Sequence, residues 1–232
     1  MLTEEGASVA GAPGAQLELS GAPLATLHAI DDEVRDHMRE LEEVSARRRA
    51  RGGEGVLWFG VGYHPLAAQA ELPWVPKPRY GVMREYLPTR GQRGLDMMRR
   101  TATVQANFDY ESEEHAMRCL RLGSRLAPLT SALFANSPFV EGRPFGGVSQ
   151  RTQVWLDVDP SRQGLLPRLW SVDTGFADYV AWALDAPMFL LLRPEGIVPN
   201  TGQTFREFVP HACGEHRPAM DAWLAHLISM FP

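Results

Sequence analysis

The chain has 232 residues, of which 44% are hydrophobic and 22% are charged, a composition typical of a globular protein and not of a disordered or fibrous one. The formal net charge of −5 argues against a general nucleic-acid binder, which needs a surplus of cations to neutralise phosphates. No apolar run is long enough to cross a bilayer, so we expect no membrane partner either. The two cysteines, Cys119 and Cys213, provide no disulfide scaffold, and the cytoplasm is therefore the expected location.

The first fifty residues predict a loop, a strand and a long helix. Residues 1–15 are acidic and rich in Gly and Ala, and we expect them to form a flexible N-terminal segment without the features of a signal peptide. Residues 16–20 alternate polar and apolar side chains, which predicts a strand. Pro23 suits the first position of a helix. Apolar residues then recur three to four apart over residues 24–44 and form one helical stripe, which Gly52–Gly53 ends.

Strands and helices alternate along the rest of the chain. The patterns predict strands at 56–61, 101–109, 149–158 and 188–192, and helices at 80–87, about 112–135, 176–184 and 219–230. Residues 63–78 form a Pro-rich loop, and no linker or internal repeat divides the chain. This mixture predicts an α+β fold, with a mainly antiparallel sheet flanked by helices.

The segment 101–109 carries an unusual polar face. In a strand, its threonines, Gln105, Asn107 and Asp109 would share one side, and its apolar residues the other. This face is mostly amide and hydroxyl, whereas a solvated sheet face usually carries Lys and Glu. It therefore indicates a polar cavity or a Mg²⁺ site, since Mg²⁺ prefers oxygen ligands. An ordinary half-exposed strand explains the pattern equally well. Glu18 lies in a strand of similar character, although a single carboxylate is more often a surface residue.

A second candidate site lies in the segment SQRTQVWLDVDPSRQG. Arg151 and Trp155 could hold a carboxylate between a bidentate guanidinium and an aromatic wall. The alternative is that the two side chains simply pack against each other. Asp159 and Arg162 follow in the same segment.

Other reactive residues give weaker signals. His211, Cys213 and His216 lie close together, but zinc sites typically draw on two separated ligand pairs, so we interpret this run as a polar loop. Lys77 is the only lysine, and no glycine-rich phosphate loop surrounds it. Without a recognisable nucleophile, a reaction that forms no covalent enzyme intermediate is favoured.

Five segments, in this order, resemble the plant-type glutamate–cysteine ligases. They are QLELSGAPLATLH, PRYGVMREYLPTRGQRGLDMMRRTATVQANFD, ALFANSPFVEG, SQRTQVWLDVDPSRQGLLP and TGQTFREF. The resemblance implies the catalytic fold of glutamine synthetase, in which an antiparallel sheet forms a funnel-shaped site. It also implies an enzyme that uses ATP and Mg²⁺ to phosphorylate glutamate. The amine of cysteine then displaces phosphate and gives γ-glutamylcysteine, the first step of glutathione biosynthesis.

The resemblance also implies roles for residues near the nucleotide. Glu18, Gln105 and Asn107 would be the metal ligands. Gln105 and Arg162 would contact the nucleotide.

On the substrate side, the same resemblance implies that Arg151 and Trp155 hold glutamate. Met98 and Thr101 would line the pocket of that substrate.

The chain also departs from the family pattern. The family begins with an acidic strand whose paired glutamates bind metal, and it continues into a further catalytic loop, so we expect residues 16–232 to be part of a catalytic domain. Two alternatives remain open at this point. One is a sister ligase that supplies γ-glutamylcysteine for an ergothioneine-type thiol, and the other is a non-catalytic remnant that retains the fold.

Overall fold

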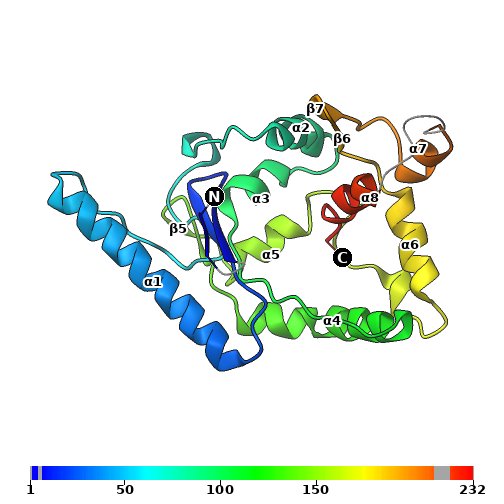
Figure 1. The fold of residues 1–232 in the computed structure, drawn as a ribbon, viewed down its shortest axis with the longest axis horizontal. Coiled ribbons are helices and arrows are strands. Elements are labelled where there is room, and N and C mark those ends of the chain that lie inside the picture. The colour runs from blue at the N-terminus through cyan, green and yellow to red at the C-terminus, as the bar shows by residue number, and fades with distance from the viewer. Residues whose placement is uncertain (1, 5–6, 212–219, 232) are drawn as a thin grey trace.

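A computed structural model describes residues 2–4, 7–211 and 220–231 (Figure 1). Strands β1 (Leu2–Glu4), β2 (Ala7–Ala12) and β3 (Gln16–Ser20) form an antiparallel sheet. The predicted strand β3 is confirmed, but the expected loop over the first 15 residues is wrong where β1 and β2 form. Gly14 allows the turn between β2 and β3, because its φ is +79° and a Cβ there would clash with the carbonyl oxygen of Arg99.

Helix α1 (Leu27–Ala50) confirms the predicted long helix and extends away from the rest of the molecule (Figure 1). It begins at Leu27 and not at Pro23, because the Thr26 hydroxyl accepts a hydrogen bond from the amide of Ala29 at 3.2 Å and caps the helix there. The indole of Trp58 donates to Ser45 Oγ at 3.0 Å. This contact ties the C-terminal half of α1 to the segment that follows it.

The remaining elements form the body of the protein. Its helices are α2 (Pro78–Tyr86), α3 (Gly94–Arg100), α4 (Glu113–Leu133), α5 (Gln150–Trp155), α6 (Phe176–Asp185), α7 (Phe205–His211) and α8 (Met220–Leu227), with 3-10 turns at Gln69–Glu71, Leu87–Thr89 and Pro167–Trp170. Its strand pairs are β4 (Phe139–Val140) with β5 (Arg143–Pro144) and β6 (Leu190–Arg193) with β7 (Gly196–Pro199). None of the described helices is both long and apolar enough to span a bilayer.

The α+β class is confirmed, and all three sheets in the described ranges are antiparallel. The helices predicted at 80–87, 112–135, 176–184 and 219–230 correspond to α2, α4, α6 and α8, and the extended segment at 188–192 overlaps β6. Helices α3 and α7 and strand β7 have no counterpart in the prediction. The predicted antiparallel sheet appears as three small antiparallel sheets in the described ranges.

Three strand predictions are wrong. Residues 149–158 contain helix α5, which Ser149 caps by accepting from the amide of Thr152 at 3.3 Å. The buried residues of α5, Gln150 and Val154, are four apart, so the spacing of the buried positions is helical here. Residues 56–61 and 101–109 form no strand, and among them only Thr101 forms a bridge, with Tyr63.

The core lies between α2, α3 and the hairpin β6–β7. Tyr86 and Phe189 meet there edge to face, with their ring centroids 5.2 Å apart, and Met98 packs beside them. A second cluster joins Met188 to Phe205 and Phe208 of α7, next to α8. These clusters fix the N-terminal end of α2 relative to β7, and both elements line the cleft described next.

Candidate functional site

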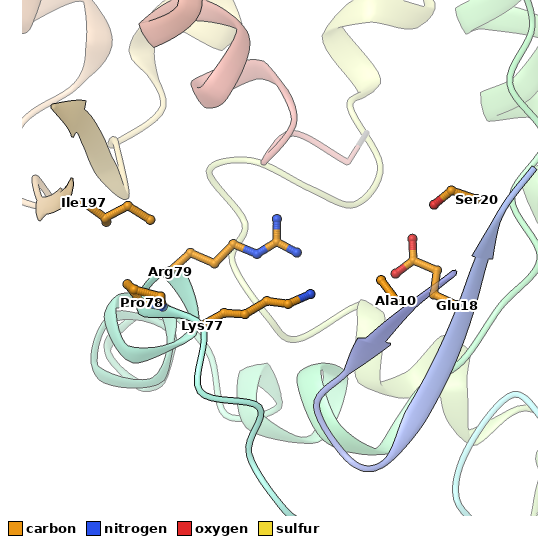
Figure 2. Close-up of a pocket in the computed structure, with 7 residues that line it drawn as sticks. All are labelled: Ala10, Glu18, Ser20, Lys77, Pro78, Arg79 and Ile197. Atoms are coloured by element: carbon orange, nitrogen blue, oxygen red, sulfur yellow. The ribbon is translucent and has the colours of Figure 1, made fainter. Parts of the chain in front are cut away.

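A cleft of about 420 Å³ opens between the N-terminal sheet and the start of α2. Figure 2 shows the Glu18 carboxylate on β3 on one side and Lys77 and Arg79 on the other, both extended toward the strands. Ser20 and Ile197 also line this cleft. The register of the sheet, with Ala10 opposite Glu18, places that carboxylate on the face that looks across the cleft.

Lys77 and Arg79 come to this cleft from the N-terminus of α2, where Lys77 is the N-cap residue and Arg79 lies in the first turn. Pro78 occupies the first turn of that helix, so the two basic residues flank a position where the missing N–H of proline is harmless. The ammonium of Lys77 donates to the carbonyl of Gly11 at 3.0 Å, which anchors α2 to strand β2. Arg79 lies over the ring of Tyr80, 4.9 Å from its centroid. Lys77 was discounted from the sequence and Arg79 was not among the predicted site residues, although a lone lysine two residues from an arginine is a usable signal.

The charges of this cleft suit an anion together with a cation. An ammonium and a guanidinium can neutralise phosphate or carboxylate oxygens, while Glu18 supplies one carboxylate oxygen donor opposite them. Mg²⁺ in nucleotide sites is typically held by one or two carboxylates plus phosphate oxygens. The donors present therefore fit a magnesium–phosphate group better than an all-protein metal cage.

Gln105 and Asn107 are not among the residues that line this cleft. Both are exposed on the segment after Thr101, and the amide of Gln105 donates to the side-chain oxygen of Asn107 at 2.8 Å. This contact shows that the two side chains lie together. The structure does not bring them to Glu18.

Arg151 and Trp155 lie one turn apart on α5, with the guanidinium carbon 5.3 Å from the ring centroid. This is the mutual packing considered as the alternative. However, Arg151 Nε and Trp155 Nε1 are buried and have no hydrogen-bond partner among the described residues. Burial also lowers the pKa of Arg151. A partly desolvated guanidinium with a free donor is suited to an incoming carboxylate.

Thr101 lies close to Arg151, because Tyr63 contacts the first residue and its neighbour Gly62 contacts the second. Thr101 pairs with Tyr63 in an antiparallel bridge, and a Cβ added to the neighbouring Gly62 would lie 3.5 Å from Cδ of Arg151. Tyr63 is 1% exposed, and burial, together with the charge of Asp96, raises its pKa to about 12. The structure thus brings two of the predicted substrate-binding residues, Thr101 and Arg151, to the same region.

Met98 and Arg162 are core residues in this structure. Met98 is 6% exposed, in the cluster formed with α2 and β6. Arg162 is 2% exposed and donates from Nε to Asp159 at 2.7 Å, from Nη1 to Ser229 Oγ at 2.8 Å and from Nη2 to the carbonyl of Pro187. Because all three nitrogens have internal partners, the geometry favours a structural role for Arg162 over a nucleotide contact.

The run that contains His211, Cys213 and His216 lies largely outside the residues that the structure describes. Residues 212–219 lie outside the described residues, so the polar-loop interpretation of His211, Cys213 and His216 stays a prediction. In the ranges that are described, no three His, Cys, Asp or Glu side chains form a group that could hold a metal ion.

Comparison with protein families gives a match over nearly the whole chain. The family "Glutamate-cysteine ligase family 2" matches residues 3–232. This range contains the cleft, helix α5 and the segment after Thr101.

Curated relatives carry names of the same kind. The chain is 43% identical over 224 residues to "Glutamate--cysteine ligase B, chloroplastic" of Oryza sativa subsp. japonica, a match that covers 95% of this chain and 44% of the relative. It is 43% identical to "Glutamate--cysteine ligase, chloroplastic" of Arabidopsis thaliana and 42% identical to the protein of that name from Medicago truncatula, covering 42% and 43% of them. The chain therefore spans less than half the length of these relatives.

Proposed function

Because this chain belongs to glutamate–cysteine ligase family 2, we propose that it contributes to an ATP- and Mg²⁺-dependent ligase that joins glutamate to cysteine. The observation that supports this most directly is the cleft of Figure 2, where Glu18 lies across from Lys77 and Arg79. The two cations can receive phosphate oxygens while the carboxylate faces a divalent cation. Such a site suits a reaction driven by positioning and charge neutralisation, which needs no protein nucleophile.

The proposed reaction has two steps. An oxygen of the glutamate γ-carboxylate attacks the γ-phosphorus of ATP, the bond from that phosphorus to the bridging oxygen breaks, and ADP leaves. The amine of cysteine then attacks the acyl carbon of γ-glutamyl phosphate, inorganic phosphate leaves with the C–O bonding pair, and the nitrogen loses a proton. The product is γ-glutamylcysteine, and its formation is the first step of glutathione biosynthesis.

In this proposal the cleft binds the nucleotide end. Lys77 and Arg79 would neutralise phosphate oxygens, and Glu18 would provide the protein carboxylate for Mg²⁺. The metal, when bound, would neutralise charge that develops on the transferred phosphoryl group. Gln105 and Asn107 stay proposed metal or nucleotide ligands, and they would have to move toward the cleft to act as such.

Arg151 and Trp155 would bind glutamate. The unpartnered Nε of Arg151 and its terminal nitrogens can form two parallel hydrogen bonds to a carboxylate, and the indole of Trp155 provides a wall beside it. Thr101, close to Arg151 across Gly62, would line the same pocket, and Met98 would support it from the core. Glutamate and cysteine are the proposed small-molecule partners, and the reducing cytoplasm is the proposed location, whereas the relatives are named chloroplastic.

The two alternatives are distinguishable by product. A sister ligase that feeds an ergothioneine-type thiol would carry out the same chemistry and differ in the step that consumes γ-glutamylcysteine. A non-catalytic fragment would bind ligand without turnover. Because the chain spans less than half the length of these relatives, the assay must distinguish a non-catalytic fragment from an active ligase.

The reaction is tested with the 232-residue chain and with a version extended to the full length of its relatives. We expect the extended protein to release ADP and phosphate in equal amounts only when glutamate, cysteine, ATP and Mg²⁺ are all present. We expect the 232-residue chain alone to turn over negligibly. Formation of γ-glutamylcysteine without ATP consumption would contradict the proposal, and comparable turnover of the short chain would show that no further segment is required.

Glu18 provides a narrower test of the cleft. We expect Glu18→Gln in the extended protein to raise the Mg²⁺ concentration required for half-maximal ADP release by roughly ten- to a hundred-fold, since a charge-assisted ligand worth about 1.5–3 kcal/mol is lost. The KM for glutamate should stay unchanged. Glu43→Gln is the matched control, because Glu43 is an exposed carboxylate on α1 whose ion pair among the described residues is with Arg47. An unchanged Mg²⁺ requirement would place the metal elsewhere.

A further inference from the structure

Arg100 is a buried arginine that has no role in the proposed reaction. It is the last residue of α3, is 5% exposed, and its guanidinium carbon lies 4.5 Å from the ring centroid of Tyr63, which is also buried. Its Nη1 donates to Asp96 at 3.5 Å and to Glu141 at 3.2 Å. A cation stacked on an aromatic ring is attracted most strongly where water is excluded. The contact therefore fixes the end of α3 against the segment that contains Tyr63.

The backbone on either side of Tyr63 is also bound to the end of α3. The amide of His64 donates to the carbonyl of Arg100 at 2.7 Å, and the amide of Ala102 donates to the carbonyl of Gly62 at 3.2 Å. Two of the three residues before Tyr63 are glycines, which restrict the backbone least. The buried ring is therefore the main anchor of this segment.

The other side of the same segment contacts Arg151. The amide of Gly62 donates to the carbonyl of Asn136 at 3.0 Å, and the hydroxyl of the next residue, Ser137, accepts from the amide of Arg151 at 3.1 Å. A Cβ built on Gly62 would lie 3.5 Å from Cδ of Arg151 and 3.4 Å from Ser137 Oγ, so the backbone of Gly62 packs closely against both. Gly62 thus lies between the end of α3 and the start of α5.

Movement of Gly62 would change the surface against which the Arg151 side chain rests. A guanidinium that binds a carboxylate with two hydrogen bonds has to be held within about 0.5 Å of its productive position. Ser137 holds only the backbone of Arg151, whereas Gly62 and the ring of Trp155 contact its side chain. The orientation of that side chain therefore depends on Gly62, and the position of Gly62 depends on the neighbouring ring of Tyr63.

We propose that Arg100 is a positioning residue for Arg151, and hence for the glutamate pocket. Its stack on Tyr63 holds Gly62 in place, and Gly62 in turn keeps the guanidinium of Arg151 oriented toward the substrate carboxylate. This inference rests on the proposed role of Arg151 in binding glutamate. A purely structural role of Arg100 would lower stability without discriminating between glutamate and ATP. A positioning role affects glutamate selectively, because Arg100 and Tyr63 do not line the cleft proposed for the nucleotide.

Arg100→Lys in the protein extended to the full length of its relatives tests this role. Lysine can keep the ion pairs with Asp96 and Glu141 but loses the flat stack on the ring. We expect the KM for glutamate to rise roughly three- to ten-fold, the effect of weakening one desolvated cation–π contact, while the KM for ATP stays within about twofold. Arg118→Lys is the matched control, because Arg118 is exposed on α4, where it pairs with Glu114. It should leave both KM values unchanged.

Substitutions of Tyr63 separate the effect of its ring from that of its hydroxyl. The hydroxyl is buried and has no hydrogen-bond partner among the described residues, so Tyr63→Phe should keep the KM for glutamate within about twofold. Tyr63→Leu removes the ring and should raise this KM as Arg100→Lys does. In the Tyr63→Leu background, Arg100→Lys should add less than about twofold, because residues that act through one contact are not additive. The comparison of Tyr63→Leu with Tyr63→Phe carries the test if Arg100→Lys does not fold.

Arg151→Lys, measured in parallel, distinguishes failure of this inference from failure of the proposed function. A raised KM for glutamate in Arg151→Lys, with unchanged values in Arg100→Lys and Tyr63→Leu, would overturn the positioning role and leave the proposed glutamate site intact. Equal increases in the KM for glutamate and for ATP, or additive effects of the substitutions at Arg100 and Tyr63, would also overturn it. An unchanged KM for glutamate in Arg151→Lys would contradict the proposed glutamate site and would overturn the positioning role as well.

Discussion

Arg162→Ala is expected to lower the free energy of unfolding by about 3–5 kcal/mol, the usual cost of removing one partner of a buried ion pair. The guanidinium is 2% exposed, donates to Asp159, Ser229 and the carbonyl of Pro187, and lies 3.8 Å from the centroid of the Phe189 ring. Its removal leaves the Asp159 carboxylate, which has no exposed surface, without its main partner. Urea denaturation followed by circular dichroism measures the loss.

The matched control for this substitution is Arg125→Ala. Arg125 is exposed on α4, so its removal should change stability by less than about 0.5 kcal/mol. Arg162→Lys should fall between the two, because an ammonium keeps the charge but cannot form three divergent bonds with guanidinium geometry. A decrease of less than about 1 kcal/mol in the free energy of unfolding of Arg162→Ala would contradict a major stabilising role for these contacts.

The pH dependence of stability provides a second test of the ion pair between Arg162 and Asp159. Burial alone would raise the pKa of Asp159, but hydrogen bonds from Ser161 and Arg162 and the charge of Arg162 outweigh it and hold the pKa below its usual value. A carboxyl group with a lowered pKa in the folded state adds stability above its unfolded pKa, and this stability is lost as the pH falls through the folded pKa. The acid side of the stability profile should therefore become shallower in Arg162→Ala and stay unchanged in Arg125→Ala.

Arg151→Lys is expected to weaken glutamate binding by roughly ten- to a hundred-fold, which corresponds to about 1.5–3 kcal/mol for one lost charge-assisted hydrogen bond. Lysine keeps the positive charge but loses the planar pair of donors that fits a carboxylate. Nucleotide affinity should change little, since Arg151 is not among the residues that line the cleft with Lys77 and Arg79. Calorimetric titration of glutamate and of ATP into the extended protein separates the two effects.

Gln153→Ala is the control for this second experiment, because Gln153 is exposed on the same helix α5. It should leave glutamate affinity within about twofold, the small effect expected of an exposed side chain away from the site. An unaltered response to glutamate in Arg151→Lys would mean that the guanidinium only packs against Trp155. The contact of 5.3 Å between them would then be its whole role.

The sequence by itself determined the features that depend on neighbours along the chain. Apolar spacing of three to four residues identified α1, α2, α4, α6 and α8, because the helical period is set by the local backbone. The quoted motifs identified the family that the comparison confirms. Arg151 and Trp155 were paired correctly although α5 was predicted as a strand, since residues four apart also adjoin on a helix.

The tertiary structure decided everything that depends on partners distant in sequence. Whether 101–109 joins a sheet depends on backbone groups about 40 residues away, which a local pattern cannot specify. Arg162 is indistinguishable from a ligand-binding arginine until Ser229 and Pro187 are seen to accept its protons. Only the packing of α2 against β2, through Lys77 and Gly11, places two cations opposite Glu18. Desolvation and charge pairing depend on position in space, and for these residues the fold alone supplied that position.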